Sequence, residues 1–422
     1  MFEPPDDTVL DLDLDALFGD RGQRRAQTEA QVTAALADHG LTVHLIVLCH
    51  GTDTTRFATT ARLCRALAGL LHAPGVDLSV SYQDGPAPGD LAAQLDDRVQ
   101  LLDGHRPLTD PGTGAVLPAT GKTEHLLTCL HRLLADGGDA ARRYVVFLDS
   151  DYLLYDADNA FALYAPWALG FGGERCADPG FTGVEFSKGG SLRLAVAPDI
   201  AKQALVGERT WRFLDLLDAA LTRTVPQAPP VSEVLPTGQP PTRTGLLDAL
   251  GQTGFAELEA AVEQVTKNGG RSSRALSQWL SSRSEYVVDR WLARFSHLLH
   301  GDQGATLAAW TQMELAPGYG LEVSFLLNAL FRPGPHRGRI VNALGLPHAH
   351  LPKDEPDNFA LGVELFALVQ RLRQGMTSRT TAIGPRQSPT KLGYKPVLLA
   401  PVPHAAPALY PPAATLTTGG TR

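Results

Sequence analysis

Apolar positions in the first part of the chain alternate between two spacings. Residues 24–39 have the helical spacing and end at Gly40, which predicts an amphipathic helix. LTVHLIVLCHG at 41–51 is a short apolar run, typical of a buried strand that opens into a glycine-containing loop. A helix at about 56–71 and a strand at 76–82 repeat this order. The alternation predicts an α/β protein with a mainly parallel, Rossmann-like sheet covered by helices.

A second unit of this kind ends in a group of acids. A helix is expected at 122–135, and the apolar strand RYVVFLDSDYLL follows it and carries Asp149, Ser150 and Asp151 at its carboxyl end. Sheets of this class bind ligands at the carboxyl ends of their strands. Two carboxylates at this spacing offer the oxygen ligands that Mg²⁺ or Mn²⁺ prefers, and such an ion can neutralise a diphosphate leaving group. An acidic turn after a strand is the simpler interpretation of an isolated Asp-x-Asp.

The pattern changes after about residue 190, where helical spacing dominates. Helices are expected near 254–267, 274–299, 304–313 and 356–375, and the Pro-rich stretch at 225–245 is expected to be an insertion or a surface loop. The chain is therefore predicted to have four parts: an N-terminal helical segment at 1–40, a core at 41–190, a helical region at 191–355, and a C-terminal helix with an extended tail at 356–422.

Composition narrows the class of protein. With 422 residues and 44% apolar content, the chain can bury a sizeable core. A formal net charge of −8 argues against nucleic acid as a partner. No run approaches the roughly 20 apolar residues of a membrane span, and the acidic start does not resemble a secretory signal. Four cysteines without metal-ligand spacing favour a cytoplasmic protein with reduced thiols.

Lys122 stands at the predicted start of the helix before the acidic strand. Backbone N–H groups at a helix start, together with a lysine, favour a bound phosphate. The sequence GKT also permits a phosphate loop, which would make the protein an NTPase. Val116 occupies the position where that loop requires its first glycine, and the preceding LPAT is a poor strand. These two departures count against the NTPase.

Two later segments have the residue types of a binding site for a small acid or a sugar. KNGGRSSRAL contains Gly270, Arg271 and Ser273 at a predicted helix start, where a guanidinium and hydroxyls can hold a phosphate or carboxylate. LAPGYGLEVSFLLNAL places Tyr319 and Glu322 just before an apolar helix. Taken alone, the first segment is better explained as a Gly-capped helix boundary with solvated charges, and the second can also be a helix start with an acid near its positive end.

A late pair of histidines completes the candidate chemistry. His348 and His350 flank Ala349 after the strand-like RIVNAL. A neutral imidazole is a common ligand of transition metals and can complete a shell begun by carboxylates. The sequence does not distinguish the two histidines, and a hydrogen-bonded role is the commoner one for an isolated pair.

Taken in order, these motifs resemble those of retaining GT-A glycosyltransferases that make glucosyl-3-phosphoglycerate, with a weaker likeness to mannosylglycerate synthases. The likeness covers roughly residues 42–365 and rests on five elements in the same order: the Lys122 helix, the VVFLDSD strand, the GGRSS segment, GYGLE with its helix, and a late histidine. The resemblance implies a GT-A nucleotide-diphospho-sugar transferase fold. Its nucleotide-sugar core would be 41–190, and its acceptor region 191–355.

The resemblance also implies roles for individual residues. Lys122 would contact the donor diphosphate and act in catalysis with Glu322. The donor site would comprise Lys122, Asp149, Ser150, Asp151, Tyr319 and Glu322. The acceptor phosphate would bind Gly270, Arg271 and Ser273. A Mg²⁺ or Mn²⁺ ion would be held by Asp149, Asp151 and one of His348 and His350.

The implied reaction transfers glucose from a nucleotide diphosphate sugar to 3-phosphoglycerate or a similar small acid. UDP-glucose is the first candidate donor and a GDP-sugar the second, because LCHGTD at 48–53 differs from the family's usual nucleobase loop. Related enzymes suggest a homodimer. Mannosyl transfer to glycerate or phosphoglycerate is the closest alternative. A P-loop-like NTPase and a non-catalytic protein that binds sugar nucleotides are the alternatives of another class.

Overall fold

The computed structural model describes the larger part of the N-terminal half and selected later segments. The described residues are 4, 8–13, 18, 23–84, 87–103, 107–112, 114, 116–117, 121–170, 184–189, 287–295, 297–318, 320–331, 339–344, 348–350 and 409–418. Contacts divide the chain into two compact units. One unit, here called the sheet unit, comprises Pro4–Thr210, Leu299–Lys353 and Leu409–Arg422, and the other comprises Met1–Glu3, Trp211–Leu298 and Asp354–Ala408. The predicted boundaries near 40, 190 and 355 stay a prediction.

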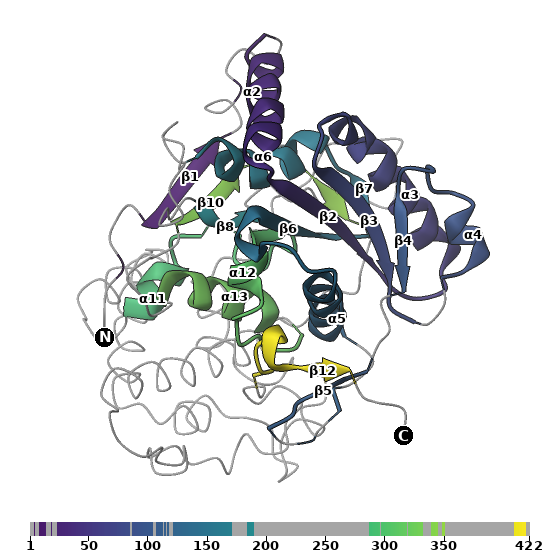
Figure 1. The fold of residues 1–422 in the computed structure, drawn as a ribbon, viewed down its shortest axis with the longest axis vertical. Coiled ribbons are helices and arrows are strands. Elements are labelled where there is room, and N and C mark those ends of the chain that lie inside the picture. Colours follow the sequence, from purple (N-terminus) through teal and green to yellow (C-terminus); the bar gives the residue numbers. More distant parts are fainter. Residues whose placement is uncertain are drawn as a thin grey trace, which may run out of the picture. The chain divides into compact units, whose positions relative to one another are not determined.

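In the described part of the sheet unit, eight strands form one sheet in the order β1-β10-β8-β9-β6-β2-β3-β4 (Figure 1). All neighbouring strands are parallel except β9, which is antiparallel to both of its neighbours. This confirms the predicted α/β class with a mainly parallel sheet. The strands are β1 (Val9–Asp13), β10 (Arg339–Leu344), β8 (Val184–Gly189), β9 (Gln303–Thr306), β6 (Arg143–Asp149), β2 (Thr42–Cys49), β3 (Val76–Tyr82) and β4 (Gln100–Asp103).

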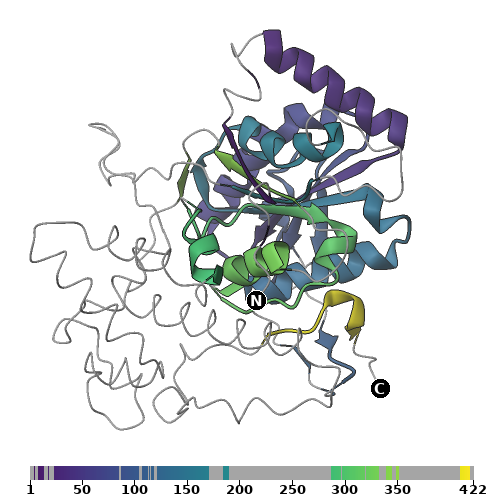
Figure 2. The same cartoon turned by 90° about the vertical axis from the view of Figure 1, so that its left-hand side faces the viewer.

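Helices cover both faces of this sheet (Figure 2). On one face lie α2 (Gln23–His39), α3 (Thr54–Leu67) and α6 (Ala157–Leu169), which contribute to a common apolar core with the sheet. On the other face lie α5 (Lys122–Ala135), α12 (Leu307–Trp310) and α13 (Gly320–Phe331). Apolar runs in β2 and β6 are buried because helices cover both sides, as the sequence pattern predicts.

Shorter elements complete the described chain. Two small sheets pair β11 with β7 and β12 with β5. In the second unit, the described part includes α11 (Val287–Leu292). The remaining elements are β5 (Leu108–Thr109), β7 (Tyr152–Leu154), β11 (Ala349–His350), β12 (Thr417–Thr418), α4 (Gly89–Ala92) and the 3-10 turns Ala68–His72, Ala140–Arg142 and Ala413–Thr415. None of the described helices combines the length and apolar character that crossing a membrane requires.

The prediction of a helix at 304–313 is correct only in its middle. Residues 303–306 form β9, Leu307–Trp310 is helical, and residues 311–313 lie outside the helix. A side chain at Gly304 would meet the Ser187 hydroxyl at 2.4 Å, so the glycine allows the neighbouring strands to approach. Long-range pairing therefore decides the structure of this segment against its local helical spacing. The N-terminal part contains a further difference, because β1 is a strand inside the predicted helical segment 1–40.

The C-terminal segment Leu409–Thr418 packs on the sheet unit. Tyr410 N–H donates to the Leu315 carbonyl at 2.7 Å, and Ala414 N–H donates to the Thr311 carbonyl at 3.0 Å. The Tyr410 hydroxyl also contacts Glu124 on α5. These bonds join residues 409–418 to α5 and to residues 311–315, which follow α12.

Candidate active site

The acidic turn at 149–151 lies at the carboxyl end of β6, in the middle of the sheet. Strand β9 is antiparallel, so the turn that precedes it, His300–Asp302, reaches this same edge. The neighbouring parallel strand β8 also ends there, with Lys188 near its carboxyl end. Three strands thus bring side chains from distant parts of the sequence to one place.

Asp149, Asp151 and His350 form a group that could hold a metal ion. Their ligand atoms all lie within 4.8 Å of one another. His350 Nδ1 lies 2.9 Å from Asp151 Oδ1, and the pairing of β11 with β7 sets His350 opposite Tyr152. Two carboxylates and an imidazole fit Mn²⁺, and also Mg²⁺ if water supplies further ligands. The geometry therefore fits the predicted ion.

His348 does not belong to this group. It is fully buried, and its ring lies against those of Tyr152, His300 and His350, with centroids 5.5, 4.6 and 5.0 Å away. Of the two histidines left open by the sequence, His350 is the one in the group with Asp149 and Asp151. The His348 ring packs against the His350 ring.

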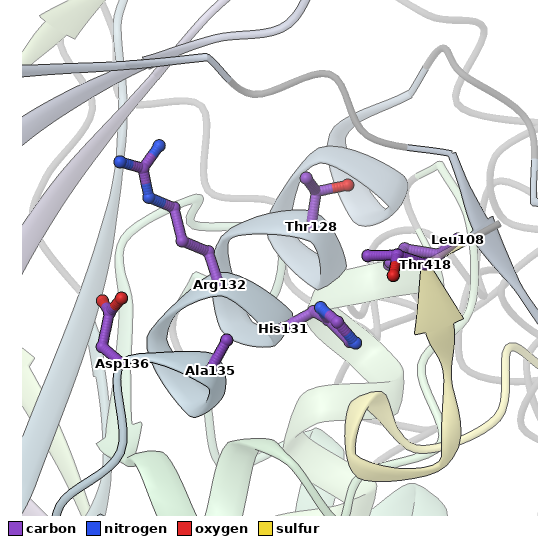
Figure 3. A pocket seen from close by; sticks show the side chains of 7 residues that line it. All are labelled: Leu108, Thr128, His131, Arg132, Ala135, Asp136 and Thr418. Atoms are coloured by element: carbon purple, nitrogen blue, oxygen red, sulfur yellow. The ribbon is translucent and has the colours of Figure 1, made fainter. Parts of the chain in front are cut away.

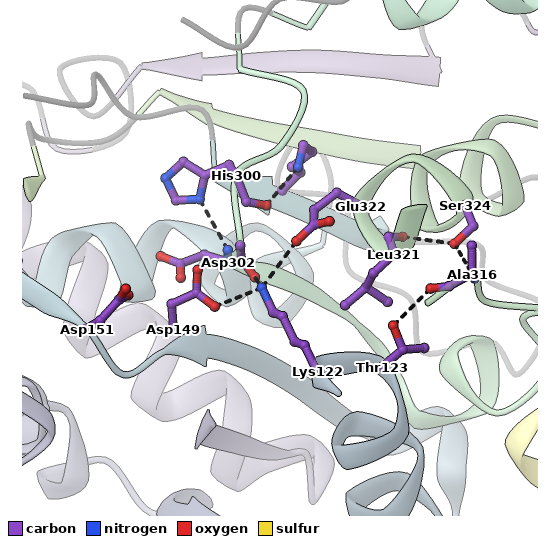
Figure 4. Close-up of polar contacts among 12 residues, drawn as sticks. Lys122, Thr123, Asp149, Asp151, His300, Asp302, Ala316, Leu321, Glu322 and Ser324 are labelled. Atoms are coloured by element: carbon purple, nitrogen blue, oxygen red, sulfur yellow. Dashed lines mark hydrogen bonds and ion pairs between the residues drawn. The ribbon is translucent and has the colours of Figure 1, made fainter. Parts of the chain in front are cut away.

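Lys122 joins the metal group to a second acid. Its Nζ lies 2.7 Å from Asp149 Oδ1 and 3.2 Å from Glu322 Oε1 (Figure 4). Burial alone would lower the pKa of Lys122, but the charges of Asp149 and Glu322 outweigh it and raise that pKa. The ammonium therefore stays charged at neutral pH. Lys122 begins α5 directly after Gly121, whose φ of 130° is open to glycine and strained for other residues.

Glu322 is buried in the first turn of α13. Its Oε1 contacts Lys122, whereas its Oε2 has no hydrogen-bond partner among the described residues. A buried carboxylate oxygen without a donor is costly, so a ligand hydroxyl at this point would be favoured. Thr123 fixes α5 to the segment before α13 by donating to the Ala316 carbonyl at 2.8 Å (Figure 4).

Asp302 is a site residue that the sequence analysis missed. Its carboxylate is buried and accepts hydrogen bonds from the hydroxyls of Tyr152 at 2.6 Å and Tyr155 at 2.7 Å. Burial raises the pKa of Asp302 to about 6, although the Tyr152 bond opposes the rise. The Tyr152 ring in turn packs against the His350 ring at a tilt of 38°, with ring centroids 4.4 Å apart. The two tyrosines after the Asp-Ser-Asp turn were the signal available in the sequence.

Lys188 was also missed. Its side chain is fully buried, and its Nζ donates to the His300 carbonyl at 2.9 Å. Burial lowers the pKa of Lys188 to about 7. A lysine within an otherwise strand-like segment, VEFSKG, was the only local signal.

Gly301 allows the close approach of its turn to Asp149. A Cβ atom at this position would lie 2.0 Å from Asp149 Oδ2, which is far inside contact distance. The Gly301 carbonyl also accepts from Lys122 Nζ at 3.5 Å. The turn and the acidic strand end are therefore packed without room for a side chain between them.

Polar groups also gather at the carboxyl ends of β2 and β3, where the resemblance expects the nucleobase. Gly51 N–H contacts Asp84, and the guanidinium of Arg56 contacts the His50 ring. The predicted donor residue Ser150 lies near them, because its carbonyl accepts from the Thr59 hydroxyl at 3.1 Å. Ser150 is itself buried.

Four predicted site residues lie outside the described residues: Tyr319, Gly270, Arg271 and Ser273. Their roles stay predictions. Of the other predicted residues, the structure brings together Lys122, Asp149, Asp151, Glu322 and His350.

A pocket of about 350 Å³ lies away from this site, beside the carboxyl-terminal part of α5 (Figure 3). It is lined by Leu108, Thr128, His131, Arg132, Ala135, Asp136 and Thr418. None of the described candidate site residues is part of its lining. Lys122 lies at the other end of α5.

Comparison with known proteins gives matches among solved structures. No family model and no curated protein matches the chain. It is similar to glucosyl-3-phosphoglycerate synthase from Mycobacterium tuberculosis in complex with Mn²⁺, UDP and phosphoglyceric acid, with 17% identity, 82% of each chain covered and a TM-score of 0.45. The same enzyme with Mg²⁺ and UDP has 17% identity, 88% of each chain covered and a TM-score of 0.44.

A further similar structure is that of a mycobacterial protein. It has 18% identity and a TM-score of 0.47, with 91% of this chain and 90% of that chain covered. The matches include the kind of enzyme that the motifs resemble. At these identities and TM-scores, the likeness does not extend to the substrates of this chain.

Proposed function

We propose that the chain is a metal-dependent glycosyltransferase of the GT-A type, which transfers glucose from a nucleotide diphosphate sugar to 3-phosphoglycerate or a similar small acid. The observation that carries this proposal is the shared carboxylate Asp149. It belongs to the group Asp149–Asp151–His350 and is also bonded to Lys122, which contacts Glu322. A cation site and a sugar-binding acid are thus linked through one lysine.

The described residues have separate tasks in this reaction. Asp149, Asp151 and His350 would hold a Mg²⁺ or Mn²⁺ ion, which supplies charge neutralisation on a leaving diphosphate. Lys122 binds an oxygen of the same diphosphate, since its ammonium stays charged. Glu322 Oε2, which has no partner among the described residues, accepts a hydrogen bond from a hydroxyl of the transferred sugar. The site works by positioning and charge, so no side chain is required as a nucleophile.

The bonds in the proposed step balance without a further reagent. The bond between the sugar's anomeric carbon and the diphosphate oxygen breaks, and a bond to the acceptor hydroxyl forms on the same face. The acceptor's proton passes to the leaving diphosphate oxygen. UDP-glucose is the proposed donor, 3-phosphoglycerate the proposed acceptor, and Arg271 the proposed anchor of the acceptor phosphate. The protein is further proposed to be a cytoplasmic homodimer.

The test is a screen of UDP- and GDP-sugars against 3-phosphoglycerate and glycerate, with Mn²⁺ or Mg²⁺ and with mass detection of the glycosylated acid. Asp151→Asn should lose at least about 100-fold in transfer, because the carboxylate in contact with His350 is removed. Asp97→Asn removes the same charge from an exposed residue far from the site and should retain full activity.

Two results would overturn the proposal. One is that no donor tested gives a glycosylated acid. The other is that the Asp151→Asn variant transfers the sugar at the wild-type rate. ATP hydrolysis independent of a sugar nucleotide would indicate the NTPase instead. Metal-dependent binding of sugar nucleotides without turnover would indicate a non-catalytic protein.

A further inference from the structure

Lys188 differs from Lys122 in its partners. Both lysines donate to carbonyls of the same turn: Lys188 Nζ to His300 at 2.9 Å and Lys122 Nζ to Gly301 at 3.5 Å. Lys122 is also paired with two carboxylates. By contrast, no acidic side chain of the described residues lies within ion-pair distance of Lys188, and the His300 carbonyl is its only acceptor among them.

A buried ammonium with one neutral acceptor is unfavourable. An ammonium offers three donors, and an uncompensated charge in the interior costs several kcal/mol. Burial is the main cause that lowers the pKa of Lys188 to about 7, and the charge of Lys122 acts in the same direction. The charges of Glu322 on α13, Asp302 in the turn and Asp149 on β6 act in the opposite direction. An anion bound beside Lys188 would supply the missing counter-charge.

Anchoring of the turn does not explain the lysine. Gly189 N–H already donates to the Asp302 carbonyl at 2.9 Å, and Asp302 N–H donates to His300 Nδ1 at 3.2 Å. Two tyrosine hydroxyls hold the Asp302 carboxylate. The turn is therefore fixed by four bonds that do not involve Lys188.

We propose that Lys188 is a substrate-binding residue of the transfer site, whose ammonium binds a phosphate or carboxylate oxygen of a substrate. The inference rests on the proposed function, which names two substrates with such an oxygen: the donor, through its diphosphate, and the small acid acceptor. The charge of Lys122 is shared with the carboxylates of Asp149 and Glu322. Lys188 would add a positive charge that no carboxylate of the described residues pairs with, and a polyanionic substrate favours such a charge.

Two substitutions separate charge from anchoring. Lys188→Met removes every donor at nearly the same length, whereas Lys188→Gln removes the charge and retains an N–H donor on a side chain one bond shorter. Isothermal titration of the full chain with UDP and, separately, with 3-phosphoglycerate measures the two sources in the presence of Mn²⁺. Thermal unfolding of each variant measures folding.

Both variants should lose at least about tenfold in affinity for one of the two probes. Weaker UDP binding identifies the diphosphate, and weaker 3-phosphoglycerate binding identifies the acceptor. The Tm of Lys188→Met should be unchanged or higher, because a poorly solvated charge is removed. Unchanged affinities for both probes, or a Lys188→Gln protein with wild-type affinities, would overturn the proposal.

The experiments distinguish a failure of the Lys188 proposal from a failure of the proposed function. Sugar transfer by the wild type, together with unchanged affinities in both variants, contradicts the role of Lys188 alone. Loss of anion binding in both variants, together with no transfer by the wild type, contradicts the transferase alone. A wild-type protein that binds neither probe also contradicts the role of Lys188.

Discussion

His350 Nδ1 lies 2.9 Å from Asp151 Oδ1, although 199 residues separate them in the sequence. The pairing of β11 with β7 makes this contact, since it sets His350 opposite Tyr152. The candidate metal group is therefore closed by the fold, and its last member arrives late in the chain.

Replacement of the two histidines by alanine should have different effects. His350→Ala should weaken Mn²⁺ binding by at least about tenfold, because it removes a member of the group. His348→Ala should mainly lower stability, since its fully buried ring packs against three neighbours. Titration of Mn²⁺ followed by electron paramagnetic resonance, with urea unfolding of both variants, checks this. The reverse pattern would assign the ligand to His348.

Gly301→Ala should disable transfer without a change in charge. The added methyl group would lie 2.0 Å from Asp149 Oδ2, so the carboxylate or the turn must shift. A displacement of about 1 Å can cost about 100-fold in rate. Gly69→Ala is the matched control, because nothing lies within 4 Å of a methyl group there. Equal transfer rates in the two variants would show that the Asp149 position does not matter.

Asp302→Asn should change how stability depends on pH. Burial raises the pKa of Asp302 to about 6, above the ordinary value of 3.8. The folded state therefore binds the extra proton, and the stability this contributes is present at low pH and lost as the pH rises through about 6. Relative to the wild type, the variant should gain about 1 kcal/mol in unfolding free energy between pH 5 and pH 7.5.

Urea unfolding at the two pH values measures this difference. A constant offset between wild type and Asp302→Asn would show that the Asp302 carboxylate titrates in the same range in the folded and unfolded states. Loss of the tyrosine hydrogen bonds lowers the unfolding free energy of the variant at both pH values. The difference in unfolding free energy between the two pH values therefore does not depend on that loss.

Tyr410→Phe should destabilise the sheet unit. Glu124 contacts the Tyr410 hydroxyl through Oε1, and its buried Oε2 has no hydrogen-bond partner among the described residues. The variant leaves the Glu124 carboxylate without that donor, which should cost about 1–3 kcal/mol of unfolding free energy. Thr415→Ala, in the same segment, removes only an exposed local bond and should cost less than about 0.5 kcal/mol. Urea unfolding compares them, and equal losses would contradict the expectation.

Local patterns were sufficient for much of the sheet unit. The helix expected at 122–135 matches α5, and the strand expected at 76–82 matches β3, because apolar spacing and the flanking turn residues agree there. Asp149 at a strand end followed from the same reasoning. The nearness of Lys122, Glu322 and His350 to that strand end followed only from the order of the motifs.

Features made by long-range pairing could not be predicted from local patterns. β9 has a helical spacing in sequence and is a strand because β6 and β8 flank it. Asp302 and Lys188 reach the site only through this reversed strand and its neighbour. Their chemistry depends on burial, and burial of a charged side chain is not visible in the sequence around it.

The order of strands in the sheet also limits when the protein can become active during synthesis. β1 pairs with β10, so Val9 has its partner Ile340 only after most of the chain has been made. His350 follows β10 directly. A ribosome must therefore complete nearly the whole chain before the first strand is covered and the metal group is closed. Prematurely released fragments would contain the aspartates and lack the histidine, so an incomplete chain cannot close the candidate metal group.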